Sequence, residues 1–223
     1  MRRGVRRWLP VVLLVGVAIA AVSTGVPVGT DGPAAVPDSR AAASDADSEA
    51  TPIESCTTIS EPGRYALTED IENGGGTILS RACIRINASD VVLDGGGHAV
   101  DGRGTSNTTG VAVTHAAERN VTVSDLRVTG WHRGVDYGRA SCGRVSDVVA
   151  ANNSYGLYLG EATGVRVSDS ELRDNLVGVE TVWAVNRLSG VDARENAGAD
   201  VHRRLPAPRQ LAERMDCRPP NGD

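Results

Sequence analysis

The chain has 223 residues, with 26 glycines, no phenylalanine and a formal net charge of −5. An acidic chain lacks the clustered basic surface that nucleic-acid phosphates require, so the composition argues against a nucleic-acid partner. About 170 residues follow position 52, which is enough for one hydrophobic core, and we expect a single folded domain.

Residues 1–22 have the three parts of a secretory signal peptide. Four arginines precede an apolar run from Trp8 to Val22, and Ala18-Ile19-Ala20 offers a small-x-small cleavage site. Two arginine pairs suggest twin-arginine export. An uncleaved anchor is the alternative, because the apolar stretch could extend to Val28, which gives the ~20 residues that a bilayer requires. We therefore expect a secreted or cell-surface protein that meets the membrane only through this segment.

The next segments are a linker and a cap. Residues 23–52 are rich in Pro, Gly, Ala, Ser and Asp and show no periodic apolar pattern, which predicts a disordered linker. Residues 53–87 are predicted to form an N-terminal cap with strands at Arg64–Leu67 and Ile84–Ile86. Residues 204–223, which contain four prolines, are predicted to form a C-terminal cap or tail.

Four cysteines in an exported chain favour disulfides. Cys56 and Cys83 bracket the predicted N-terminal cap, Cys142 falls at a predicted corner, and Cys217 lies in the tail. Of the three connectivities, we favour Cys56 with Cys83 and Cys142 with Cys217. No two of the four have the spacing of a zinc motif.

Residues 88–203 repeat with a period of about 22. Val-Ser-Asp occurs at residues 123–125, 145–147 and 167–169, and Gly134, Gly156 and Gly178 keep the same spacing. A repeat of this length is typical of a solenoid. Apolar and polar residues alternate within each repeat, which predicts short strands. A leucine-rich repeat fits less well, because Val and Ala dominate.

We therefore predict an all-β parallel β-helix of about five coils, interrupted by an insertion from Asp101 to Thr109. Equivalent residues should stack ~4.8 Å apart. Adding 22 to each position gives the predicted inward columns, which are Val123, Val145 and Val167; Leu126, Val148 and Ser170; Val128, Ala150 and Leu172; and Val135, Leu157, Val179 and Val201.

The motifs ISEPGRYALT from Ile59, CIRI from Cys83 and ASDVVLDGGGH from Ala88, followed by Asp101-Gly102, carry a family resemblance. The segment from about 55 to 203 resembles secreted right-handed parallel β-helix proteins of the NosD-like, pectate-lyase-like superfamily, which are abundant in salt-loving archaea. The resemblance implies a single-stranded right-handed β-helix. It also implies three alternative functions, namely copper handling, a polysaccharide lyase, hydrolase or epimerase, and a non-catalytic binding module.

Copper handling has the weakest support in the residues. Copper prefers Cys, Met and His ligands. The cysteines are expected to be oxidised, and Met215 is the only methionine besides the initiator. The four histidines share no column of the repeat; they are His98, His115, His132 and His202. We expect no copper cofactor.

The enzyme alternative depends on polar residues along a groove of the β-helix. The candidate catalytic residues are Asp147, Asp169, Arg173 and His132. Glycoside hydrolysis needs two carboxylates about 5 to 9.5 Å apart over a common cleft. Stacked aspartates follow from the repeat itself, however, and a solvated row of carboxylates explains them more simply.

The favoured function is a non-catalytic module that binds an extracellular polysaccharide or a surface protein. An aromatic strip would serve carbohydrate, because sugars stack on rings that present an apolar face. The candidate ligand-binding residues are Trp131, Tyr155, Tyr158 and Trp183. Simple packing of these rings at the corners is the alternative.

The stacked Asp125, Asp147 and Asp169 are also a weak candidate for a Ca²⁺ site, since hard cations take oxygen ligands. Screening by salt is the favoured alternative. Asn153 and Asn175, again 22 apart, predict a structural corner. Four asparagines begin glycosylation sequons and are candidate modification sites; they are Asn87, Asn107, Asn120 and Asn152.

Overall fold

The computed structural model describes residues 49–75, 81–113, 118–182, 185–205 and 217, all of which belong to one compact unit. The predicted signal peptide and nearly all of the predicted linker lie outside these residues. The described part is built from strands and contains no helix, so it offers no helical segment that could cross a membrane.

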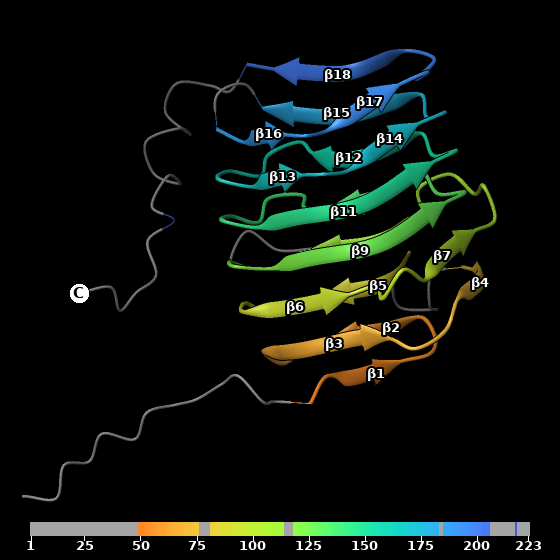
Figure 1. Cartoon of the computed structure of the whole chain (residues 1–223), viewed down its shortest axis with the longest axis vertical. Helices are drawn as coiled ribbons and strands as arrows, with labels where there is room; N and C mark the ends of the chain where they lie inside the picture. Colours follow the sequence, from red (N-terminus) through yellow and green to blue (C-terminus); the bar gives the residue numbers. More distant parts are fainter. Residues whose placement is uncertain (1–48, 76–80, 114–117, 183–184, 206–216, 218–223) are drawn as a thin grey trace, which may run out of the picture. The chain divides into compact units, whose positions relative to one another are not determined.

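The strands form two sheets in which every pair is parallel (Figure 1). Sheet A has eleven strands, which are β1 (Thr51–Ile53), β3 (Gly63–Leu67), β4 (Ile71–Gly74), β6 (Val91–Asp94), β7 (Ala99–Gly102), β9 (Thr122–Thr129), β11 (Arg144–Ala151), β13 (Arg166–Ser168), β14 (Glu171–Arg173), β16 (Arg187–Ser189) and β17 (Asp192–Arg194). Sheet B has seven strands, which are β2 (Thr57–Ile59), β5 (Ala82–Ile86), β8 (Thr109–Val113), β10 (Arg133–Asp136), β12 (Tyr155–Leu159), β15 (Val177–Val182) and β18 (Ala199–Arg204).

The chain passes back and forth between the two sheets, and each strand pairs with the equivalent strand of the next coil. This arrangement is consistent with the predicted β-helix solenoid. The 22-residue period appears directly as strand register, because Val145 lies opposite Val123 on one side and Val167 on the other. The predicted inward columns are buried between the sheets, with Val201 at the end of its column partly buried.

The sheets also cross the predicted boundary at residue 88. The segment 53–87, which was expected to be a cap, supplies β2 to β5 and the last residue of β1, and β2, β3 and β5 pair in parallel with strands of the coils that follow. The period is hidden there because the coils are longer: Gly63 lies opposite Val91, and Val92 lies opposite Thr122. Part of the extra length is the connection between β7 and β8, where an insertion was predicted.

A left-handed backbone explains the aspartate of the Val-Ser-Asp repeat. Asp125, Asp147 and Asp169 have φ angles of 48°, 55° and 49°. Aspartate and asparagine tolerate this region better than most residues with a side chain. The fourth coil places Gly190, with φ 64°, next to Ser189, the partner of Ser168. The aspartate therefore recurs because the backbone takes this left-handed conformation at the same position in each coil.

Buried asparagines stack at the next corner, as predicted. The side-chain oxygen of Asn153 accepts a hydrogen bond from the Trp131 backbone N–H, and that of Asn175 accepts one from the Asn153 backbone N–H. Asn196 continues the ladder by accepting from the Asn175 backbone N–H. Each side-chain amide also donates to a strand carbonyl, so the ladder satisfies backbone groups that burial would otherwise leave unpaired.

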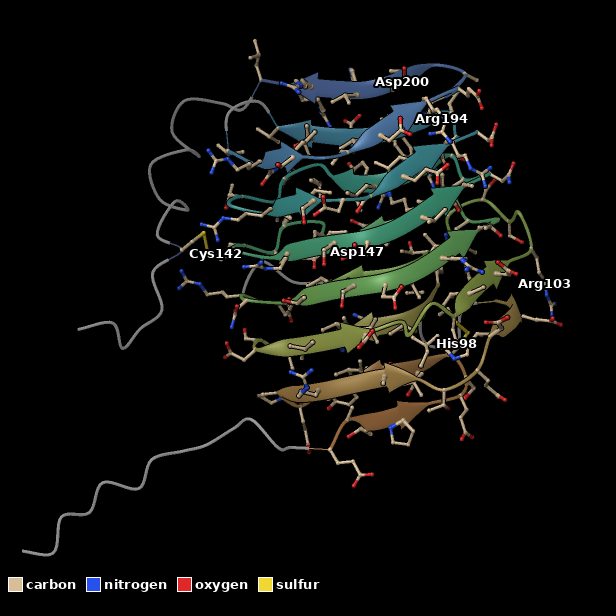
Figure 2. The ribbon with its side chains drawn as sticks, in the orientation of Figure 1. His98, Arg103, Cys142, Asp147, Arg194 and Asp200 are labelled. Carbon is tan, nitrogen blue, oxygen red and sulfur yellow. A yellow bond between two sulfur atoms is a disulfide. The ribbon has the colours of Figure 1, made fainter. Side chains whose placement is uncertain are left out.

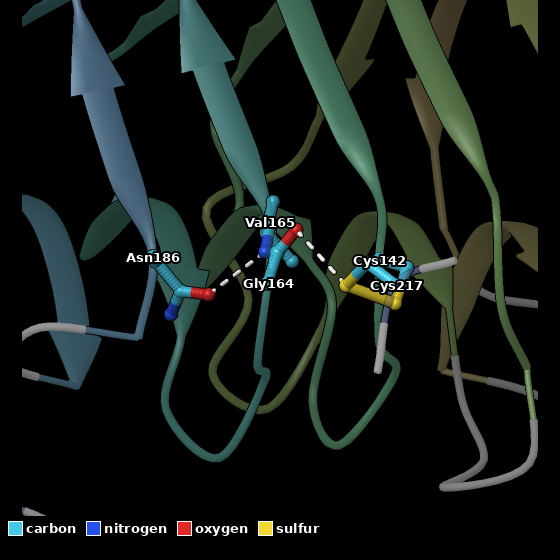
Figure 3. The surroundings of a disulfide bond; sticks show 5 residues. All are labelled: Cys142, Gly164, Val165, Asn186 and Cys217. Carbon is cyan, nitrogen blue, oxygen red and sulfur yellow. Dashed lines mark hydrogen bonds between the residues drawn. A yellow bond between two sulfur atoms is a disulfide. The ribbon is translucent and has the colours of Figure 1, made fainter. Parts of the chain in front are cut away.

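Both predicted disulfides are present. Cys56 is joined to Cys83, and Cys142 is joined to Cys217. The second bond fixes Cys217 beside the corner where β13 begins, next to Gly164 and Val165 (Figure 3). Two disulfides are typical of proteins in an oxidising compartment, which agrees with an extracellular location.

Replacing Tyr137 by phenylalanine is expected to lower the free energy of unfolding by about 1–2 kcal/mol. Tyr137 is fully buried, and its hydroxyl lies 2.9 Å from the Val121 carbonyl and 2.8 Å from the Arg144 carbonyl. Burial also raises the pKa of this phenol. The control is Tyr65→Phe, because the Tyr65 hydroxyl bonds Glu61 at the surface. Equal effects of the two changes on urea unfolding would contradict the expectation.

Candidate functional site

The structure corrects the prediction that Trp131 is a surface stacking residue. The indole is only 2% exposed, and its N–H donates to the Val100 carbonyl at 2.9 Å. The ring fills space left by three glycines: a Cβ added at Gly74, Gly102 or Gly110 would approach it to 3.1 Å or less. Trp131 is therefore core packing. Trp183, another predicted stacking residue, lies outside the described residues.

The other two predicted ligand-binding residues, Tyr155 and Tyr158, are half-buried on β12 of sheet B. Their rings meet edge to face with centroids 5.4 Å apart, and His132 meets Tyr155 in the same way at 5.7 Å. The Arg133 guanidinium lies over the Tyr158 ring at 4.0 Å and pairs with Asp136 at 2.7 Å. We call His132, Arg133, Asp136, Tyr155 and Tyr158 the tyrosine cluster.

The register of sheet B extends this cluster across further coils. Asp136 lies opposite Tyr158, Tyr158 opposite Glu180, and Glu180 opposite His202. Glu180 is 5% exposed, with His202 Nδ1 at 2.5 Å and Arg204 Nη1 at 3.5 Å. Two buried carboxylates thus stand on either side of an aromatic ring in one column.

The electrostatics of the cluster are set by burial. Burial raises the pKa of the Asp136 carboxyl, and Arg133 offsets part of that rise. Arg133 Nε is buried and has no hydrogen-bond partner among the described residues. The cluster therefore holds a carboxyl shifted toward its neutral form and an unsatisfied donor, which is unusual because buried polar groups are normally hydrogen-bonded.

Asp136→Asn is expected to change how stability depends on pH. The raised pKa means that the folded state holds the Asp136 proton more tightly than the unfolded state does. This contribution to stability is fully present below the unfolded-state pKa, near the ordinary value of 3.8, and is lost as pH rises through the folded-state pKa. Urea unfolding between about pH 3 and pH 7 measures it. The free energy of unfolding of wild type minus that of the variant should fall as pH rises. A rise in this difference would show that the attraction of Arg133 for the ionised carboxyl outweighs the cost of its desolvation.

The predicted catalytic residues do not come together. Asp147 and Asp169 are exposed residues with left-handed backbone: Asp147 lies at the middle of β11 (Figure 2), and Asp169 directly follows β13. Arg173 pairs with Asp174 at 2.7 Å and with Glu171 at 2.9 Å, and the hydrogen bond that Arg173 donates to Asp174 is the main cause of its raised pKa. An arginine in such a network stays charged and cannot act as a base. Only His132 lies in the tyrosine cluster.

The structure gives no support to a metal site. No group of three or more potential metal ligands gathers among the described residues, so Asp125, Asp147 and Asp169 are not brought together as such a group. The left-handed backbone at these three positions explains the repeated aspartate instead. His98 Nδ1 lies 3.0 Å from Asp70, and His202 contacts Glu180, so both have carboxylate partners. His115 lies outside the described residues.

Three of the four sequon asparagines share one backbone conformation. Asn107, Asn120 and Asn152 are exposed or partly exposed and have φ angles of 60°, 55° and 56°. Asn120 Nδ2 donates to Asp90 at 2.8 Å, so its amide is already used. Asn87 accepts a hydrogen bond from Arg85 Nε at 3.0 Å. Glycosylation at these sites stays a prediction.

Comparisons with protein-family models, with curated proteins and with solved structures found no match to this chain. The class of the protein is therefore defined by its own structure: an all-β chain of parallel strands, stacked coil on coil and crosslinked by two disulfides.

Sequence reasoning did not bring Asp136 and Glu180 together, although a signal for their shared column exists. Asp136, Tyr158, Glu180 and His202 are each 22 residues apart. The period therefore contained an outward column of two carboxylates, a phenol and an imidazole. It was overlooked because the four residue types differ, whereas Val-Ser-Asp repeats identically.

Proposed function

We propose that the chain is an extracellular carbohydrate-binding module, which holds a glycan against the tyrosine cluster on the outer face of sheet B. The observation that carries the proposal is the pair of half-buried rings at 5.4 Å beside the Arg133–Asp136 ion pair. Rings offer stacking surfaces to sugars, and a few placed polar groups fix the orientation of a ligand.

The supporting features are those expected of an exported module. Disulfides persist in oxidising compartments, and the N-terminal sequence has the form of a signal peptide. The proposal also includes the architecture expected from the sequence, which is a right-handed β-helix of about five coils with a cap at its C-terminal end. A surface protein is the alternative partner for the same face.

Tyr155→Ala is expected to weaken glycan binding by about two- to tenfold, because an aromatic contact contributes about 0.5–1.5 kcal/mol. A glycan array first identifies the strongest ligand, and calorimetric titration then compares wild type with the variant. Tyr65→Ala is the matched control, since it removes a half-buried tyrosine from β3 of sheet A. Equal losses in the two variants, or no array ligand for the folded wild type, would contradict the proposal.

A second candidate function is glycoside hydrolysis, and one observation favours it. Asp136 and Glu180 are two coils apart in one column, a separation of about 9.6 Å along the stack. Inverting glycosidases hold their carboxyls about 6.5–9.5 Å apart, and the acid among them has a raised pKa. If the chain is an enzyme, Asp136→Asn should abolish release of reducing ends from the array ligand while Asp147→Asn leaves it unchanged. Absence of turnover in wild type removes this candidate and leaves binding.

A further inference from the structure

Three arginines form a column at the start of successive strands of sheet A. Arg144 lies opposite Arg166, and Arg166 lies opposite Arg187. They are the first residues of β11, β13 and β16, which are neighbouring strands in Figure 1. All three are exposed. We call them the arginine column.

The arginine column lacks the partners that neighbouring arginines have. Across the described residues, none of its three side chains makes a hydrogen bond or an ion pair, whereas Arg173 and Arg194 on the same sheet are tied to Glu171. Like charges about 4.8 Å apart along the stack repel one another. The chain has 28 acidic residues and 23 arginines, so three unpaired stacked guanidiniums are unusual in it. A bound anion would relieve the repulsion between them.

A pocket opens beside the column. It has a volume of about 540 Å³ and is lined by Arg166, Arg187 and Arg203 together with Thr181 and Asn186. Arg203 comes from β18 of sheet B, so both sheets contribute guanidinium groups. The wall also includes Gly164 and Cys217, which the disulfide to Cys142 holds in place (Figure 3). The pocket is independent support for a ligand at this edge, because it gathers three cationic side chains around one hollow.

Neutral and acidic groups run parallel to the arginines on the same face. Ser146 lies opposite Ser168, and Ser168 opposite Ser189, two residues along each strand from the arginine. The exposed Asp147 and Asp169 follow directly. Each coil thus presents a guanidinium, then a hydroxyl, then a carboxylate or, in the last coil, a glycine.

We propose that this face binds a linear anionic glycan, with its sulfate or carboxylate groups on the arginine column and its hydroxyls on the serine and aspartate rows. Arginine forks match planar and tetrahedral oxyanions, and hydrogen bonds of this charged type are the strong ones. The serines and aspartates suit sugar hydroxyls. These aspartates repel any polyanion, but a glycan with free hydroxyls can offset the repulsion by donating hydrogen bonds to them, whereas polyphosphate has no hydroxyls and nucleic acid has few.

The anionic-glycan site is separate from the tyrosine cluster, which lies on sheet B. Its test uses variants that leave the cluster unchanged, so the two proposals can fail independently. Arg166→Gln/Arg187→Gln removes two column members. Arg127→Gln/Arg139→Gln removes the same charge elsewhere, from β9 and from the exposed pair with Glu161.

Binding of the full chain is measured by calorimetry in about 0.15 M sodium chloride, where exposed charges act over only about 8 Å. The probes are dextran sulfate, polyglucuronate, uncharged dextran and inorganic polyphosphate. We expect dextran sulfate, polyglucuronate or both to bind, and the one that binds identifies sulfate or carboxylate as the group recognised. Uncharged dextran should not bind through this face. The column variant should lose about tenfold or more in affinity and the control less than about twofold.

Three results would overturn the inference. One is equal loss of affinity in the column variant and the charge-matched control, which would mean that only net charge acts. Another is tighter binding of polyphosphate than of either charged glycan. The third is no binding of either charged glycan by a wild-type chain whose circular dichroism shows it to be folded. Arg166→Lys/Arg187→Lys provides a final check, since it keeps the charge and should still lose affinity if the forked geometry matters.

Discussion

Replacing Gly134 by alanine is expected to lower the free energy of unfolding by about 3 kcal/mol. A Cβ at this position would lie 2.6 Å from the Gly156 carbonyl oxygen and 2.9 Å from Val128 Cγ2. The first neighbour is backbone of the next coil, which cannot move without disturbing the parallel register. A Cβ added at Gly156 would likewise lie close to the Gly178 carbonyl oxygen. The 22-residue spacing of Gly134, Gly156 and Gly178 thus reflects the close approach of successive coils.

The control for this change is Gly75→Ala. A Cβ at Gly75 would have no atom within 4 Å, so the substitution should change stability by less than about 0.5 kcal/mol. Urea unfolding followed by circular dichroism measures both. If the Gly134→Ala variant were as stable as the Gly75→Ala variant, the claim that the coils stack closely at this column would be wrong.

Replacing Asn153 by alanine is expected to cost about 3 kcal/mol, because it breaks the asparagine ladder at its centre. The Asn153 side chain accepts from the Trp131 N–H at 2.9 Å and donates to the Val128 carbonyl at 3.1 Å and the Ala151 carbonyl at 3.0 Å. Alanine would leave these buried groups unpaired, at about 1–3 kcal/mol for each one that water cannot reach.

The neighbouring Asn152 provides the control. It is exposed and has a φ angle of 56°, which glycine adopts without strain. Asn152→Gly should therefore leave the free energy of unfolding within about 1 kcal/mol of wild type. Hydrogen exchange adds a second readout, because the Trp131 amide should lose protection in Asn153→Ala and keep it in Asn152→Gly. Retained protection in both would mean that the ladder does not hold the corner.

The parallel register was predictable where the coils have equal length. From Thr122 onward the strands of sheet A are offset by 22 residues up to β14, so adding 22 to Val123 gives its partner. Upstream of Thr122, connections of unequal length shift the offset, so the parallel pairing of strands such as β3 with later coils is not visible in the sequence. Sequence periodicity detects a solenoid only where the loops as well as the strands repeat.

The site was less predictable, because whether an aromatic ring is buried depends on how much space the side chains of the neighbouring coils leave for it. Trp131 and Tyr158 both looked like surface rings, but Trp131 faces Gly74, Gly102 and Gly110, which make room for its indole. Tyr158 instead lies under the Arg133 guanidinium on the outer face. These contacts join residues from different coils whose spacing is irregular, and no local pattern marks them.

The proposed glycan site is tested most directly by hydrogen exchange of the wild-type chain with and without the strongest ligand from the array. Binding at the tyrosine cluster predicts slower exchange at residues 132–136 and 155–158, in β10 and β12 and the corners that precede them. It predicts little change in β1 and β3. Slower exchange confined to strands away from sheet B, with none at β10 or β12, would contradict the assignment of this face.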